Sequence, residues 1–80
     1  MLSYETKKND LIEKIENGDA LTASDLVTGR GRVIEFDDLP PRTRERFYKN
    51  YVTGDYQDEY ERRTACEIAY YSIAPTVYSD

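Results

Sequence analysis

Aliphatic and phenylalanine side chains are scarce in this chain, and their scarcity limits the core that it can bury. Only 16 of its 80 residues are Leu, Ile, Val or Phe, a fraction at the lower edge for folded proteins. Eight tyrosines offset the shortage, because each offers a large apolar ring with a polar tip. We therefore expect a single small domain over residues 1–80, of marginal stability, which a partner or a second copy can complete.

Two residue types needed for common catalytic and metal sites are nearly missing. The chain has no histidine and one cysteine, Cys66. Ser-His and Cys-His nucleophile pairs and histidine-containing zinc sites therefore cannot form within it, nor can an internal disulfide. The sequence predicts a protein that is not an enzyme and uses no metal or cofactor. Cys66 is expected to be a small buried hydrophobe in a helix.

The sequence shows no targeting or membrane signal. The first ten residues lack the apolar run of a signal peptide. No segment approaches the roughly 18 apolar residues of a membrane-spanning helix. A cytoplasmic location and no membrane partner are therefore expected.

Helical periodicity, caps and stop signals predict a mainly α fold, a small α+β domain with about four helices and one short strand pairing. The predicted helices span residues 4–17, 23–28, 40–52 and 55–73. Ser3 and Gly18 are the expected caps of the first helix, and Asp55 is the expected N-cap of the last. Residues 32–36 predict a short strand, whose partner is either residues 76–78 or the same strand of a second copy.

The last predicted helix carries two apolar stripes at helical spacing. One stripe contains Tyr56, Tyr60, Thr64, Ile68 and Tyr71, and the other contains Cys66, Ala69, Tyr70 and Ile73. So wide an apolar surface means that the helix is central, or that part of it contacts a partner. Both explanations remain open from the sequence.

Acids and tyrosines alternate at the start of that helix, and this acidic run is the first candidate site. It comprises Asp55, Tyr56, Asp58, Glu59, Tyr60 and Glu61. Carboxylates can replace phosphates in a basic groove, and tyrosine is enriched at interface hot spots. In the competing structural explanation, the acids complement the helix dipole and pair with Arg62 and Arg63, while both tyrosines are buried.

A cationic helix face is the second candidate site. Arg42, Arg46 and Lys49 lie within about 60° of one another at 100° per residue. Such a face can meet nucleic-acid phosphates or an acidic protein surface, and Arg30 and Arg32 extend it if their loop folds nearby. The formal net charge of -5 argues against nucleic acid, whose binding depends on neutralising phosphates.

The sequence therefore favours a non-catalytic, acidic protein-binding module. Such a small regulator or inhibitor occupies a surface of a larger protein, for example a nucleic-acid-binding groove. Compact acidic proteins of mobile elements that counter host defences offer a general analogy, which no residue motif carries. The alternative is a small dimeric nucleic-acid-binding regulator that uses Arg42, Arg46 and Lys49.

Overall fold

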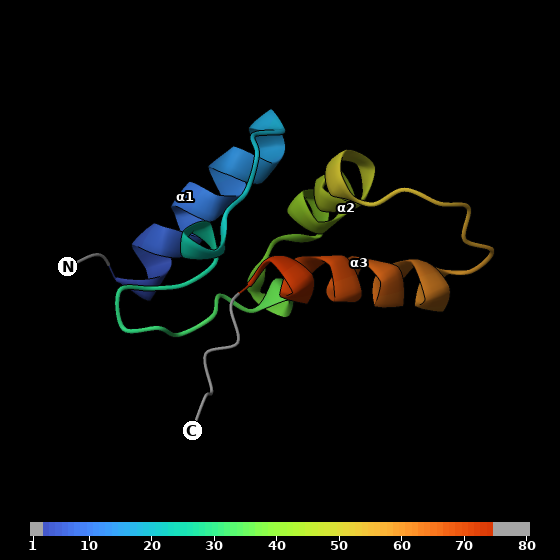
Figure 1. Ribbon diagram of the computed structural model, residues 1–80. Coiled ribbons are helices and arrows are strands. Elements are labelled where there is room, and N and C mark those ends of the chain that lie inside the picture. The colour runs from blue at the N-terminus through green and yellow to red at the C-terminus, as the bar shows by residue number, and fades with distance from the viewer. Residues whose placement is uncertain (1–2, 75–80) are drawn as a thin grey trace, which may run out of the picture.

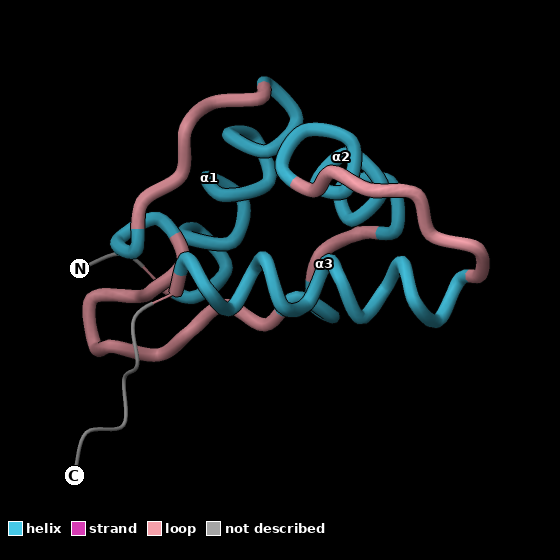
Figure 2. The backbone as a smooth tube through the Cα atoms, turned by 45° about the vertical axis from the view of Figure 1, so that its right-hand side comes forward, coloured by secondary structure: helices cyan, strands magenta, loops and turns pink. Residues whose placement is uncertain are grey.

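The computed structural model describes residues 3–74, and helices make up most of this part of the chain (Figure 1). The α-helices of this region are α1, Tyr4–Asn17; α2, Pro41–Tyr51; and α3, Glu59–Ile73. Helix α2 packs against both α1 and α3. Figure 2 shows that the connection from α1 to α2 runs beside α1, whereas the loop from α2 to α3 lies at the other end of the molecule. A mainly helical fold is thus confirmed, with three α-helices in the described residues instead of about four.

Helix α1 begins and ends where the sequence predicts. The Ser3 hydroxyl accepts a hydrogen bond from the Thr6 N–H at 3.2 Å, which satisfies one of the free donors of the first turn. Gly18 has a φ of 75°, a left-handed conformation that ends the helix at little cost only for glycine. Leu11 and Ile15 are the buried residues of the helix, one turn apart on the same face.

The prediction of a helix over residues 23–28 is wrong, because only Ala23–Asp25 forms a single 3₁₀ turn. Asp25 accepts the Thr22 N–H at 2.8 Å, as the acid of a capping box does. The turn ends there because the next segment pairs with another stretch of backbone. The Leu26 carbonyl accepts the N–H of Ile34 at 2.8 Å.

Residues 32–36 pair with the segment just before them. Val27 and Val33 form an isolated antiparallel bridge, so the pairing is local and needs no second copy. The predicted strand does not continue, because the chain enters a 3₁₀ turn at Phe36–Asp38. The partner predicted at residues 76–78 lies outside the described residues.

Helix α3 begins four residues later than predicted. Its N-cap is Asp58, whose Oδ1 accepts the Glu61 N–H at 2.8 Å, so the prediction of Asp55 as N-cap is wrong. The Tyr48 hydroxyl of α2 donates a hydrogen bond to the Gly54 carbonyl at 3.2 Å and ties the chain to α2 just before Asp55. Residues 52–58 therefore form a loop that connects α2 to α3.

An aromatic cluster joins α2, α3 and the 3₁₀ turn before α2. Phe36, Phe47 and Tyr70 pack edge to face, with ring centroids 5.2–5.7 Å apart. The Tyr70 hydroxyl donates a hydrogen bond to the Ile34 carbonyl, so its polar tip is satisfied in the core. The aliphatic side chains buried around this cluster are Leu11, Ile15, Leu26, Ile34 and Leu39. Aromatic rings thus fill a core that the aliphatic residues are too few to fill.

Candidate functional site

The two apolar stripes of α3 have opposite environments. Cys66 and Tyr70 are buried, which confirms the expectation for Cys66, and burial raises the pKa of its thiol. Tyr60 and Ile68 of the other stripe keep 79% and 64% of their surfaces exposed. Exposed large apolar residues that cluster on one face, in contrast to scattered ones, mark interaction surfaces.

The exposed apolar residues of this second stripe form a surface that we name the outer stripe. It comprises Tyr56, Tyr60, Ile68 and Tyr71. The structural explanation that buries Tyr56 and Tyr60 in the core is therefore wrong. For Tyr60 the reason is that Phe36 and Phe47 pack on Tyr70, which leaves another side of α3 facing solvent, whereas Tyr56 lies before α3 in the chain.

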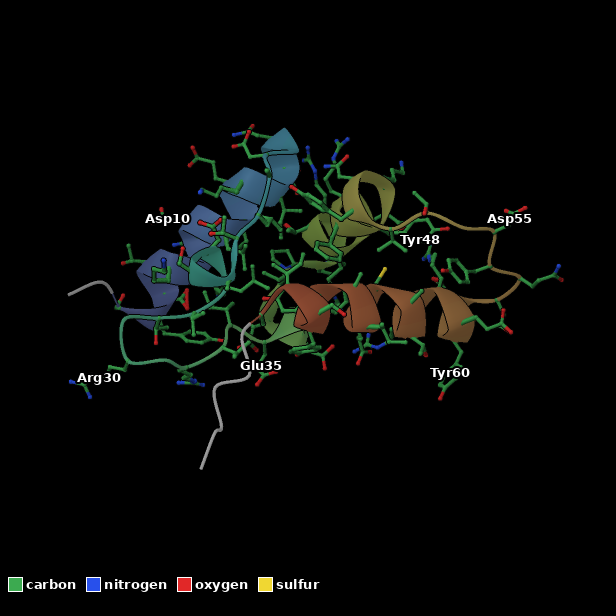
Figure 3. All side chains as sticks on the ribbon, in the orientation of Figure 1. Asp10, Arg30, Glu35, Tyr48, Asp55 and Tyr60 are labelled. Atoms are coloured by element: carbon green, nitrogen blue, oxygen red, sulfur yellow. The ribbon has the colours of Figure 1, made fainter. Side chains whose placement is uncertain are left out.

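One end of the outer stripe is held rigidly. The Tyr71 hydroxyl donates a hydrogen bond to Glu35 Oε2 at 2.7 Å and accepts one from the Phe36 N–H at 3.2 Å. Burial, together with the bond to Glu35, raises the pKa of Tyr71 to about 12, although the Phe36 bond opposes this shift. These bonds hold the Tyr71 hydroxyl at the start of the 3₁₀ turn, whereas Tyr60 projects away from the helix (Figure 3).

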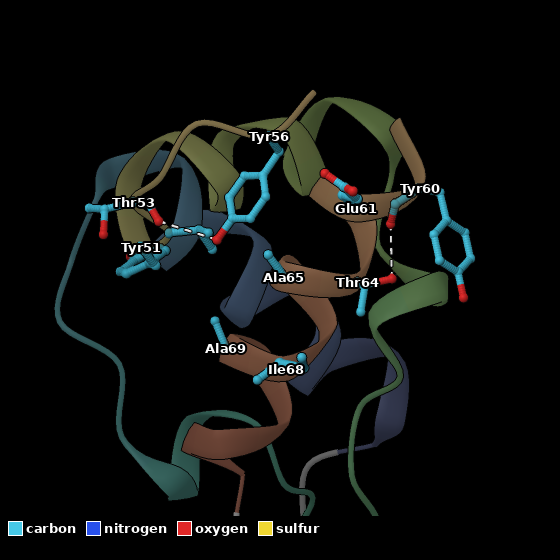
Figure 4. A pocket seen from close by; sticks show the side chains of 10 residues that line it. Tyr51, Thr53, Tyr56, Tyr60, Glu61, Thr64, Ala65, Ile68 and Ala69 are labelled. Atoms are coloured by element: carbon cyan, nitrogen blue, oxygen red, sulfur yellow. Dashed lines mark hydrogen bonds between the residues drawn. The ribbon is translucent and has the colours of Figure 1, made fainter. Parts of the chain in front are cut away.

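A groove of about 540 Å³ lies between α3 and the loop formed by residues 52–58 (Figure 4). Ala65, Ile68 and Ala69 line it on the helix side. Tyr56 lines it on the loop side, where its ring packs edge-on against Tyr48 with centroids 6.2 Å apart. The space exists because alanines stand where larger side chains would fill it.

Negative charge is concentrated at the loop end of this groove. Residues 51–61 contain four acids and no base. All four carboxylates of the acidic run are exposed: Asp55, Asp58, Glu59 and Glu61. Glu59 pairs with Arg62 at 2.5 Å, and Asp58 caps α3. Asp55 and Glu61 form no ion pair with any residue in the described range 3–74, so their charge is available to a partner.

The neighbouring arginines connect α3 to the rest of the fold. Arg62 pairs with Glu45 of α2 at 3.1 Å as well as with Glu59. Arg63 pairs with Glu67 at 2.8 Å and with Asp37 of the 3₁₀ turn, and not with an acid of the acidic run as the structural explanation expects. Of the ion pairs expected between the acidic run and these two arginines, the described residues contain one, between Glu59 and Arg62.

The cationic residues of α2 lie together but share a carboxylate. Arg42 and Arg46 approach the same Oε1 atom of Glu16 at 3.6 and 3.9 Å. Lys49 is exposed on the last turn of the same helix. Glu16 therefore neutralises part of the positive charge with which this face would bind a phosphate.

The glycine-flanked arginines do not extend the cationic face. The Arg32 guanidinium lies 4.3 Å from the ring centroid of Tyr4, at the first residue of α1. Glu16, which meets the cationic face, is twelve residues further along α1, or about 18 Å at 1.5 Å per residue. Arg30 projects from the molecule on the same side as the start of α1 (Figure 3).

The acidic run contains three residues that line the groove, Tyr56, Tyr60 and Glu61, but not the helix-side residues that follow them. Ala65, Ile68 and Ala69 lie beyond that run and were not among the predicted site residues. The sequence signal for Ile68 and Ala69 was that the helix carries two apolar stripes, whereas packing on a small core needs only one; Ala65 belongs to neither stripe.

Comparison with family models, with curated proteins and with solved structures found no match. Residues 3–74 contain no group of three or more His, Cys, Asp or Glu that could hold a metal ion. No helix in this range has the length and apolar character needed to cross a membrane.

Proposed function

We propose that this protein is a non-catalytic binding module that docks through its outer stripe on a larger protein. The observation that supports this proposal is the exposure of Tyr60 and Ile68 on α3 while Tyr70 fills the core. Aromatic side chains are enriched at interfaces, and a few of them carry most of the binding energy. Burial of this stripe would also add to the stability of a small domain.

The charge around the outer stripe supports a basic partner surface. Exposed carboxylates lie next to Tyr56 and Tyr60 in the chain, and Asp55 and Glu61 form no ion pair within the described residues. A basic, nucleic-acid-binding groove has the complementary chemistry, so the specific proposal is a cytoplasmic regulator or inhibitor that occupies such a groove. Binding of nucleic acid through α2 is less well supported, because Arg42 and Arg46 already face Glu16.

Substitution of Tyr60 by serine tests the proposal. We expect Tyr60→Ser to weaken capture of the partner by about 30-fold, the effect of losing a hot-spot side chain worth about 2 kcal/mol. The measurement is affinity capture from cell extract with and without nuclease, followed by mass spectrometry. Capture should survive nuclease and weaken as salt is added.

The matched control is the double variant Arg42→Gln/Arg46→Gln, which alters exposed side chains of α2. This variant should capture the same protein as the wild type. A set of captured proteins that is unchanged by Tyr60→Ser would contradict the proposal. Recovery that depends on intact nucleic acid and on the two arginines would instead favour the nucleic-acid alternative.

A further inference from the structure

We infer that the groove between α3 and residues 52–58 accepts the apolar face of a cationic amphipathic helix, with Glu61 contacting a Lys or Arg on that helix. This inference rests on the proposed function and specifies the chemistry of the partner. It adds a recognition site, the groove, to the exposed residues of the outer stripe.

The shape of the groove suits a helix. Its lining on α3 extends from Tyr60 to Ala69, nine residues or about 13 Å along the axis. That length covers more than two helical turns, so two anchors spaced three or four residues apart on the incoming helix can enter together. Ala65 and Ala69 leave room for those anchors, and Ile68 and Tyr56 offer apolar contacts on either side.

The charge of the groove favours a positively charged binding partner. Glu61 is the one charged side chain among the residues that line it. A carboxylate beside an apolar groove favours an ammonium or guanidinium group in the complex and disfavours a second carboxylate. The exposed acids Asp55 and Asp58 lie nearby in the chain and add to the same preference.

A second copy of this chain fits the groove poorly. The most exposed apolar side chain of the outer stripe, Tyr60, is flanked by Glu59 and Glu61. Its insertion would bring these carboxylates against Glu61 of the first copy, and like charges at an interface are unfavourable.

The loop wall of the groove depends on a glycine. Gly54 has a φ of 135°, and a Cβ atom placed there would lie 3.0 Å from the Tyr56 ring. The Tyr56 hydroxyl also donates a hydrogen bond to the Thr53 carbonyl at 3.4 Å (Figure 4). Gly54→Ala would therefore displace Tyr56 and reshape the groove without changing a buried core residue.

The test uses two synthetic helical peptides that share a leucine face and carry either lysines or glutamates on the other face. The full chain, labelled for NMR, is titrated with each peptide. We expect the lysine peptide to shift the amide signals of Thr53, Ala65 and Ala69, and the glutamate peptide to bind at least tenfold more weakly. Equal binding of the two peptides, or shifts confined to α1, would overturn the inference.

Two variants tie the binding to the groove. Ala65→Phe fills the groove from a position outside the core cluster, and should weaken binding of the lysine peptide at least tenfold. Glu61→Gln should reduce the preference for the lysine peptide over the glutamate peptide. Glu13→Gln, which changes an exposed acid on α1, should leave this preference unchanged. Thermal unfolding shows that each variant is folded. Unchanged affinity in Ala65→Phe and an unchanged preference in Glu61→Gln would contradict the inference.

The two proposals fail in different ways. If Tyr60→Ser loses the captured protein but Ala65→Phe retains it, the outer stripe binds and the groove does not. If neither variant affects capture, the proposed function fails, and the peptide titration alone decides whether the groove binds a cationic helix.

Discussion

Phe47→Ala will destabilise the protein by about 3–5 kcal/mol, the usual cost of removing a buried phenylalanine ring. Phe47 is fully buried and contacts the rings of Phe36, Tyr51 and Tyr70. A domain of this size has a total stability of about 4–12 kcal/mol, so the variant should lose a quarter or more of it and unfold at a clearly lower urea concentration. Urea titration followed by circular dichroism measures the loss.

Ile68→Ala is the matched control for this prediction. It also removes a large apolar side chain, but Ile68 lies on the exposed side of α3. The free energy of unfolding should change by less than about 0.5 kcal/mol. Equal losses in the two variants would show that α3 buries both stripes.

The protein will lose stability steeply as the pH rises above 10, because Tyr70 must stay neutral in the core. Burial raises the pKa of Tyr70 far above its ordinary value of 10.0. Below pH 10 the hydroxyl is neutral in both states and its full contribution is present. Above pH 10 the unfolded chain releases this proton and the folded chain retains it, so Tyr70 alone lowers the free energy of unfolding by about 1.4 kcal/mol per pH unit, and Tyr71, whose pKa is also raised, adds to the loss.

Tyrosinate absorbance and circular dichroism, recorded together across this pH range, check the prediction. Ionisation of Tyr70 should coincide with loss of helix. Tyr70→Phe leaves the Ile34 carbonyl without its donor and should cost about 1–3 kcal/mol at neutral pH, but its stability should fall less steeply above pH 10. A wild-type helix signal that persists after every tyrosine has ionised would contradict the burial of Tyr70.

Local signals predicted the helices well where the caps were unambiguous. Ser3 and Gly18 define α1, and Pro41 opens α2 because its missing N–H is not needed in the first turn. The start of α3 was missed because Asp55 and Asp58 are equally good caps by residue type. The hydrogen bond from Tyr48 to the Gly54 carbonyl favours Asp58 over Asp55 as the cap. It joins α2 to the following loop, so it could not be read from the local sequence.

Two further differences concern the strand pairing and the buried stripe of α3. Val27 and Val33 flank a turn that contains Gly29 and Gly31, a spacing from which the bridge could have been predicted. Periodicity could not decide which stripe of α3 is buried, because both stripes are apolar. The choice depends on the rings of other elements that pack on Tyr70, and these contacts are long-range in the sequence.

Ile68→Ser gives the most direct test of the claim that α3 folds through one stripe and binds through the other. Isoleucine and serine have similar helix propensities, so the substitution mainly removes an exposed apolar side chain. We predict an unchanged urea midpoint together with a loss of partner capture of about tenfold or more. A clearly lowered midpoint would place Ile68 in the core, and unchanged capture would separate the outer stripe from binding; either result would contradict the claim.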